Sequence, residues 1–171
     1  MYGLGYTGKG GRTAVAIRQI RTFSDLVLYT VSRPVEAIDD RIRLLLDDMA
    51  ETMYHAGGAG LAACQIGILR RLVVIDVGEG LLKLVNPVLL KKRGRQTVQE
   101  GCLSFPDIWV NRVRPSRVVA EAQDENGKRI RIVGSGLLAQ CLCHELEHLD
   151  GIVLADQWRP AYHEGAEHSL I

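Results

Sequence analysis

The sequence CHELEHLDG, near the carboxyl end of the chain, contains the pattern H-E-x-x-H. If this segment is helical, His144 and His148 lie one turn apart on the same face, so both imidazoles can bind one metal ion. The carboxylate of Glu145 then lies beside that ion, where it can take a proton from a water molecule. The pattern therefore predicts metal-assisted hydrolysis. A solvated polar helix face, to which Glu147 and Asp150 would contribute, is the alternative.

Two histidines do not complete a catalytic metal site, so a further protein ligand has to be found. One class of metallopeptidase extends the pattern to H-E-x-x-H-x-x-G-x-x-H, but the last position is Leu154 in this chain. Another class takes a ligand from further downstream, where the polar tail offers His163, Glu164 and His168. We expect these tail residues to be solvated rather than bound to a metal ion.

Cys102 is the upstream candidate for the missing ligand. It lies in the segment QEGCLSFP, with Gly101 before it and Pro106 after it. Glycine frees the backbone on one side and proline stiffens it on the other, so the segment can hold a side chain and nearby N–H groups in place. A thiolate with two imidazoles and an open fourth position is a known catalytic metal environment. A buried core thiol, the usual role of a free cysteine, is the alternative.

A third segment, GGAGLAACQIG at residues 57–67, is rich in small residues. Residues 58–63 fit the loose dinucleotide pattern G-x-G-x-x-A, but they follow a predicted helix and precede a strand, the reverse of the order which that fingerprint requires. Small residues instead allow close approach of the backbone to an extended ligand such as a peptide. Gln65 adds an amide donor, although taken alone it would be interpreted as a surface residue in a turn.

Two helices are predicted from hydrophobic periodicity. The segment 37–56 places its apolar residues on one helical face, Asp39 or Asp40 can cap its start, and Gly57 follows its end. The second helix, which Gly151 closes, carries the H-E-x-x-H pattern. Its apolar stripe consists of Leu137, Leu138, Cys141, Leu142 and Leu149.

Strands are predicted between these helices. Residues 71–77 and 82–90 are typical of buried strands separated by a glycine turn. Further on, Asn126-Gly127 lies between two β-rich segments and predicts a hairpin. The sequence therefore predicts an α+β fold, a single compact domain of short mixed or antiparallel strands around the metal-bearing C-terminal helix.

Composition limits the class of protein. With 171 residues, 47% of them hydrophobic, and a net charge of +1, the chain is typical of a globular protein and has no basic surplus for nucleic acid or anionic membranes. No apolar run approaches the roughly 20 residues of a membrane span. Four irregularly spaced cysteines fit a reducing cytosol better than a disulfide scaffold. We expect residues 1–13 to be a flexible glycine-rich extension and residues 14–171 to form the domain, with a short polar tail.

The three segments occur together and in order, as Gly58–Gln65, Glu100–Ser104 and His144–His148. In this combination they resemble the three motifs of the peptide deformylase family, and the similarity extends from about residue 17 to residue 156. The resemblance implies removal of the N-formyl group from new chains that begin with formylmethionine. It also implies one divalent metal ion, with Fe²⁺ preferred over Zn²⁺, Ni²⁺ or Co²⁺. The implied location is a bacterial cytoplasm or an organelle, and the partner is a nascent formylated chain at the ribosome, without direct contact to nucleic acid or membrane.

The resemblance also assigns roles to individual residues. The implied metal ligands are Cys102, His144 and His148. Glu145 would act as general base and then as acid, while the Gln65 amide and the Leu103 N–H would stabilise the oxyanion. The peptide would bind as an added β-strand against Gly58, Ala59, Gly60, Leu61 and Glu100. An apolar pocket for methionine would be walled by Leu137 and Cys141.

Two positions depart from the usual family pattern. Cys64 stands where many deformylases have proline, which can alter strand rigidity or sensitivity to oxidation. Glu147 replaces an aspartate, and its longer carboxylate can pair with a basic side chain such as Arg114. Two other functions stay open: a zinc peptidase that uses a tail ligand, and a metal- or peptide-binding module without activity. The presence of Glu145 argues against the second, because ligation alone does not need that carboxylate.

Overall fold

The computed structural model describes residues 15–154, so the expected N-terminal extension and the tail candidates His163, Glu164 and His168 lie outside the described residues. The helices are η1 (Leu26–Tyr29), α1 (Asp40–His55), η2 (Ala63–Ile66) and α2 (Gly136–Leu149). The strands are β1 (Gly60–Ala62), β2 (Leu72–Ile75), β3 (Leu82–Arg93), β4 (Gln96–Cys102), β5 (Phe105–Arg114), β6 (Arg117–Gln123) and β7 (Arg129–Ser135).

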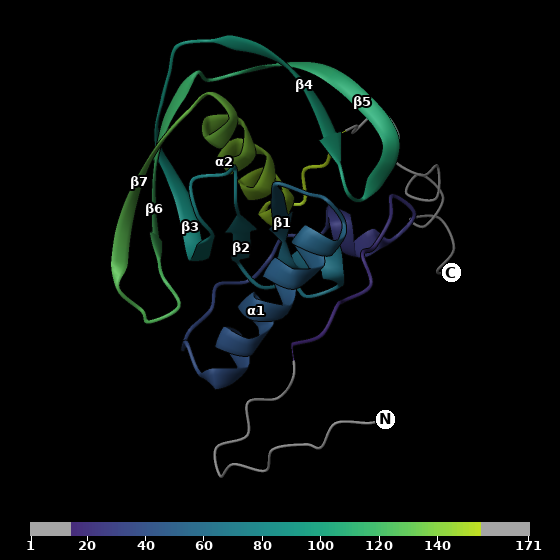
Figure 1. Cartoon of the computed structure of the whole chain (residues 1–171), viewed down its shortest axis with the longest axis vertical. Helices are drawn as coiled ribbons and strands as arrows, with labels where there is room; N and C mark the ends of the chain where they lie inside the picture. Colours follow the sequence, from purple (N-terminus) through teal and green to yellow (C-terminus); the bar gives the residue numbers. More distant parts are fainter. Residues whose placement is uncertain (1–14, 155–171) are drawn as a thin grey trace, which may run out of the picture.

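The strands form two sheets (Figure 1). Five of them make an antiparallel sheet in the order β1-β2-β3-β6-β7. The hairpin β4–β5 is a separate two-stranded sheet that passes over α2 in Figure 1. The predicted α+β domain around a C-terminal helix is confirmed, with every strand pair antiparallel. No helix within residues 15–154 is long and apolar enough to cross a membrane.

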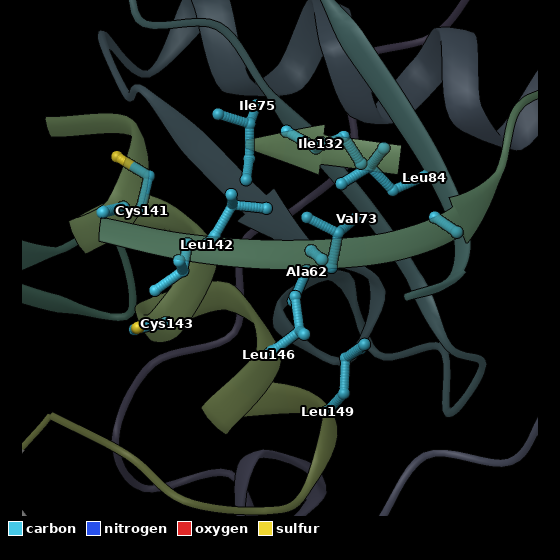
Figure 2. Packing of buried hydrophobic residues seen from close by; sticks show 14 of the residues in the cluster. Ala62, Val73, Ile75, Leu84, Ile132, Cys141, Leu142, Cys143, Leu146 and Leu149 are labelled. Atoms are coloured by element: carbon cyan, nitrogen blue, oxygen red, sulfur yellow. The ribbon is translucent and has the colours of Figure 1, made fainter. Parts of the chain in front are cut away.

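The short strands β1 and β2 are buried on both faces. Successive strand residues point to opposite sides, so Val73 and Ile75 of β2 pack toward α2, whereas Leu72 and Val74 pack toward α1. Figure 2 shows the first of these layers, in which Leu142, Leu146 and Leu149 of α2 meet the sheet. The sheet is thus held between two helices, and the continuous apolar sequence of β2 follows from burial on both sides.

Both predicted helices are present. Asp39 caps α1, because its carboxylate accepts the Ile42 N–H at 2.9 Å. After α2, Gly151 has φ +72°, and a Cβ there would lie 2.7 Å from the Tyr29 carbonyl oxygen, so only glycine fits. Within the apolar stripe of α2, Leu142 and Leu149 are fully buried, whereas Leu137 is 52% exposed and lines a cavity.

The predicted strands and hairpin are present within a few residues of the expected bounds. The turn between β6 and β7 contains Gly127 with φ +81°. The sequence did not indicate the β4–β5 hairpin. Polar and apolar residues occur in it in similar numbers, and exposed positions alternate with half-buried ones. Because its buried positions include the ion pair of Arg114 with Glu100 as well as Phe105, hydrophobic periodicity gave no clear signal for it.

Candidate active site

Three potential metal ligands converge where the end of β4 meets the middle of α2. Cys102 is the last residue of β4, and His144 and His148 lie one turn apart on α2. Their ligand atoms all lie within 4.8 Å of one another. The Cys102 Sγ is 3.2 Å from Nε2 of His148, and the two imidazole rings have centroids 4.9 Å apart. The structure therefore brings together the thiol and both imidazoles that the sequence selected.

The chemistry of these three side chains fits a divalent cation. Burial lowers the pKa of His148 well below its usual value, so its ring is neutral, which is the form that ligates a metal. Burial also lowers the pKa of His144, but hydrogen bonds with Cys102 and Glu100 outweigh that effect and raise the value to about 10. The negative groups that hold this proton on His144 would equally stabilise a metal cation bound there in its place. One sulfur and two nitrogen donors suit zinc or iron.

Glu145 lies beside this cluster in a buried position. Its side chain is 4% exposed, and its Oε2 has no hydrogen-bond partner among the described residues. Burial raises the pKa of Glu145 to about 7. A carboxyl group with such a pKa can accept and return a proton near neutral pH, as a general base and acid must.

Glycines in the segment after α1 make room for the side chains of the site. A Cβ on Gly60 would lie 2.5 Å from Oε1 of Glu145, and one on Gly58 would lie 2.7 Å from Cδ1 of Leu103. The sequence attributed these small residues to the approach of a peptide. The structure gives them an additional role, because they admit the side chains of Glu145 and Leu103.

Gly60→Ala is expected to lower the rate of the chemical step by about 10²-fold, since a displacement of about 1 Å at a reacting group has an effect of that size. The added methyl group must push the Glu145 carboxylate from its place. Steady-state kinetics and metal analysis of the purified variant would test this. The comparison variant is Gly58→Ala, which meets the flexible end of Leu103 and lines the cavity, so it should affect KM more than the rate of the chemical step. Equal effects of both variants would contradict the assignment.

Gln65 is held by contacts at both ends of its amide group. It lies in η2, is 1% exposed, and its Oε1 accepts the Ala62 N–H at 2.8 Å. Its Nε2 lies 3.2 Å from the Ser104 hydroxyl oxygen and 3.6 Å from Cys102 Sγ. The amide donor is thus fixed next to the candidate ligand. Sequence reasoning gave no role to Ser104, although it lies within the Glu100–Ser104 motif.

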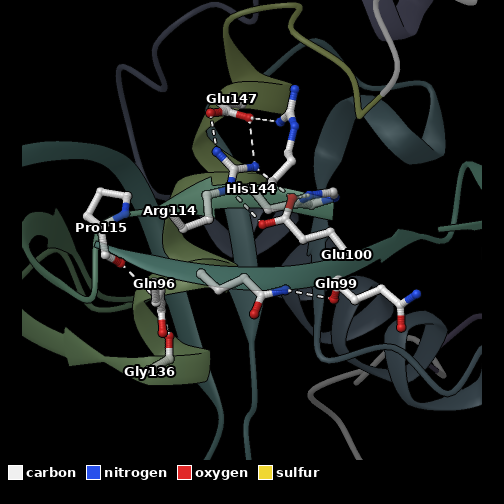
Figure 3. Close-up of polar contacts among 10 residues, drawn as sticks. Gln96, Gln99, Glu100, Arg114, Pro115, Gly136, His144 and Glu147 are labelled. Carbon is white, nitrogen blue, oxygen red and sulfur yellow. Dashed lines mark hydrogen bonds and ion pairs between the residues drawn. The ribbon is translucent and has the colours of Figure 1, made fainter. Parts of the chain in front are cut away.

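A network of charged side chains connects the outer side of α2 with His144 (Figure 3). Arg114, which is 6% exposed, donates to Glu100 from Nε at 2.6 Å and from a terminal nitrogen at 2.8 Å. It also pairs with Glu147, as the sequence suggested, and Arg112 pairs with the same carboxylate at 2.9 Å. Oε2 of Glu100 lies 3.4 Å from Nδ1 of His144. A carboxylate that accepts a hydrogen bond from the ring nitrogen not bound to the metal fixes the orientation of a metal-binding histidine.

The Glu100 carboxylate remains ionised over a wide pH range. Burial raises the pKa of Glu100, but the hydrogen bonds and charge of Arg114 and the hydrogen bond to His144 outweigh burial and lower it to about 2. Burial lowers the pKa of Arg114, but the negative charges of Glu100 and Glu147 outweigh burial and raise it. Each buried ion in the network therefore depends on its partners.

Arg114→Met is expected to destabilise the fold by about 3–5 kcal/mol at neutral pH, because it leaves the buried Glu100 carboxylate without its partner. The free energy of unfolding from denaturant titration of the metal-free protein measures this. Arg112→Met is the matched control: its side chain is 27% exposed and pairs with the same Glu147, so the loss should be at most about 1 kcal/mol. Similar losses for both variants would contradict the central position of Arg114.

A cavity of about 520 Å³ opens beside the cluster. Six of the seven residues that the sequence assigned to substrate binding line it, namely Gly58, Ala59, Gly60, Glu100, Leu137 and Cys141. Leu61, the seventh, does not, because its side chain is fully buried in the core against α1. Trp109 lines the same cavity and was not selected from the sequence.

Cys64 is packed away from solvent behind the site. It is fully buried, and its Sγ lies 3.3 Å from the carbonyl oxygen of His148. Burial raises the pKa of this thiol to about 12. Because oxidation needs an accessible thiolate, the expected sensitivity of Cys64 to oxidation is not supported by its environment.

The sequence matches the family described as Polypeptide deformylase over residues 17–164, which is most of the chain. The chain belongs to the peptide deformylase family. Members of this family are metal-dependent hydrolases that remove N-formyl groups from nascent peptides. The match spans all three motifs and joins the Cys102 segment and the H-E-x-x-H helix in one family pattern.

Individual relatives give the same result. Peptide deformylase 2 of Clostridium acetobutylicum is 52% identical over 143 residues, which cover 83% of this chain and 95% of the relative. The peptide deformylase of Acetivibrio thermocellus is also 52% identical, with 84% of each chain covered. Among solved structures, the Legionella pneumophila peptide deformylase superposes with a TM-score of 0.81 at 41% identity, covering 85% of this chain and 88% of that one. The Thermotoga maritima peptide deformylase has a TM-score of 0.80 at 38% identity, with coverages of 82% and 96%.

Proposed function

We propose that this protein hydrolyses the formyl group of N-terminal formylmethionine on newly synthesised chains and releases formate. The observation that carries this proposal is the convergence of Cys102, His144 and His148 next to the buried Glu145 in a lined cavity. Family membership supports the same reaction. A zinc peptidase with a tail ligand would leave Cys102 without a role, so we do not favour it.

The side chains of the site divide the chemistry among them. When bound by Cys102 and the two histidines, a divalent cation lowers the pKa of water and polarises a carbonyl oxygen. Glu145 takes the proton of the attacking water and returns it to the departing amine. The Gln65 amide and the Leu103 N–H donate hydrogen bonds to the oxyanion that develops on the formyl oxygen. Fixing the Gln65 amide beforehand, as its contacts with Ala62 and Ser104 do, lowers the cost of that stabilisation.

The substrate backbone is proposed to bind along β1. This strand lies at the edge of the five-stranded sheet, so one side of it is free to pair with an extended peptide. Gly58 and Ala59 precede it and line the cavity together with the Glu100 region. Leu137 and Cys141 wall the apolar part of the cavity, which suits the methionine side chain. Because the side chain of Leu61 is buried in the core, only the backbone of Leu61 is available to contact the peptide.

The reaction is tested by formate release from formyl-Met-Ala-Ser. We expect the metal-replete protein to release formate and leave the peptide otherwise intact by mass spectrometry. New internal peptide termini without formate would support the peptidase instead. Because the reaction acts on nascent chains, we place the protein in the bacterial cytoplasm, or in an organelle if its source is eukaryotic, with ribosomes as the place of encounter.

The ion is proposed to be Fe²⁺, on the basis of the family resemblance. Protein sites generally bind Zn²⁺ more tightly than Fe²⁺, so the metal content of a purified sample does not by itself identify the active ion. Rates are therefore compared for iron-, nickel-, cobalt- and zinc-loaded protein of measured metal content, before and after exposure to air. We expect the iron form to be fast and to decay in air. A zinc form that is equally fast and equally stable would identify a zinc enzyme.

A further inference from the structure

An exposed tryptophan lies at the mouth of the cavity. Of the large hydrophobic side chains in residues 15–154, that of Trp109 is the most exposed, at 65%. It belongs to β5, where it shares an outward face with Asn111 and Val113. The indole ring lies against Gly101 of β4: a Cβ on Gly101 would be only 3.1 Å from its Cη2. Glycine at this position therefore lets the ring lie flat against the hairpin.

The ring extends the apolar wall of the substrate cavity outward. Trp109 lines the same cavity as Leu137 and Cys141, but no described residue covers its outer surface. An exposed ring that also lines a binding cavity is accessible to a ligand bound in that cavity. Indole rings are also well suited to recognition, because they offer a large rigid surface and one N–H donor.

We propose that Trp109 binds the side chain of the third residue of the substrate and gives the enzyme a preference for apolar and aromatic residues there. This inference rests on the proposed function. In an extended peptide added to β1, residues one and three point to the same side and lie about 6.6–6.8 Å apart along the strand. When methionine occupies the pocket walled by Leu137 and Cys141, the third side chain points into the same cavity, which Trp109 also lines.

The preference is measured with two substrates, formyl-Met-Ala-Phe and formyl-Met-Ala-Ser. For the wild-type protein we expect KM to be about 5- to 10-fold lower for the phenylalanine peptide, since an aromatic contact is worth roughly 0.5–1.5 kcal/mol beyond the area that it buries. Trp109→Ala should raise KM for that peptide to the value for the serine peptide, with kcat unchanged. Trp109→Phe should retain part of the difference.

Val113→Ala is the matched control, because Val113 is exposed on the same face of β5 but does not line the cavity. It should leave both KM values unchanged. A wild-type protein without preference between the two peptides, or a Trp109→Ala variant that keeps the wild-type preference, would overturn the proposal. The same assay reports separately on the proposed function, because formate release by the wild-type protein from either peptide tests that function whatever the preference between them.

A fluorescence titration tests the contact without turnover. The chain has two tryptophans, so Trp158→Phe leaves Trp109 as the single indole. Adding the deformylated peptide Met-Ala-Phe should change the emission of Trp109, whereas Met-Ala-Ser should change it little. Equal responses to both peptides, or none at peptide concentrations that compete with substrate, would overturn the contact. If no formyl peptide is hydrolysed, the proposed function fails, and this titration still decides whether Trp109 binds the third residue.

Discussion

Glu145→Gln is expected to lower kcat by about 10²–10⁴-fold while the protein keeps its metal ion, because an amide cannot take up the proton of the attacking water. Glutamine has nearly the same shape as glutamate, so the buried position of residue 145 stays filled. The rate of formate release and the metal content of the same sample are the measurements. Glu51→Gln, on the exposed side of α1, is the control and should be fully active.

The pH dependence provides a second test of the same role. Glu145 acts as a base only when it is ionised, and burial raises its pKa to about 7. For the wild type, kcat/KM should therefore fall as the pH decreases below that pKa, which a bound cation would lower further. The acid limb should be absent from the residual activity of Glu145→Gln. Near-normal turnover of a metal-replete variant, with an unchanged pH profile, would show that another group is the base.

Cys102→Ser should weaken metal binding by about 10²-fold or more, because a serine hydroxyl stays protonated and is a much poorer ligand than a thiolate. Activity at limiting metal should fall in parallel. The measurement is the dissociation constant of the ion in competition with a chelator. Circular dichroism of the metal-free variant would show that the fold is retained.

Cys141→Ser is the matched control, because Cys141 lines the same cavity but is not part of the converging group. Its metal affinity should be unchanged. His163→Ala and His168→Ala test the tail ligands of the peptidase alternative, and we expect both to keep their metal. Loss of the ion from a tail variant, with retention in Cys102→Ser, would favour the peptidase.

The sequence was sufficient to select the candidate groups for the chemistry. His144 and His148 were predictable as a pair because helix geometry alone places them on one face. Cys102 and Gln65 could be chosen only as candidates from their local sequence, since each had an ordinary structural alternative. The family motifs, taken together, were needed to join them. Asp39 as a helix cap and the Asn126-Gly127 turn were likewise local features, and the structure contains both.

The tertiary structure decided which distant residues meet. Glu100 and Arg114 lie on adjacent strands of a hairpin whose mixed polar and apolar sequence gives no clear hydrophobic period, so neither their pairing nor the addition of Arg112 and His144 could be foreseen. The contact of Gly60 with Glu145 joins two segments that are far apart in the chain. Local patterns reflect the geometry of one helix or turn. The fit of a side chain against a remote glycine, or of the buried Glu100 carboxylate between Arg114 and His144, depends on how the elements pack. The sequence by itself therefore selected the candidate reacting groups, and the packing of β1 and the β4–β5 hairpin against α2 decided how they are held.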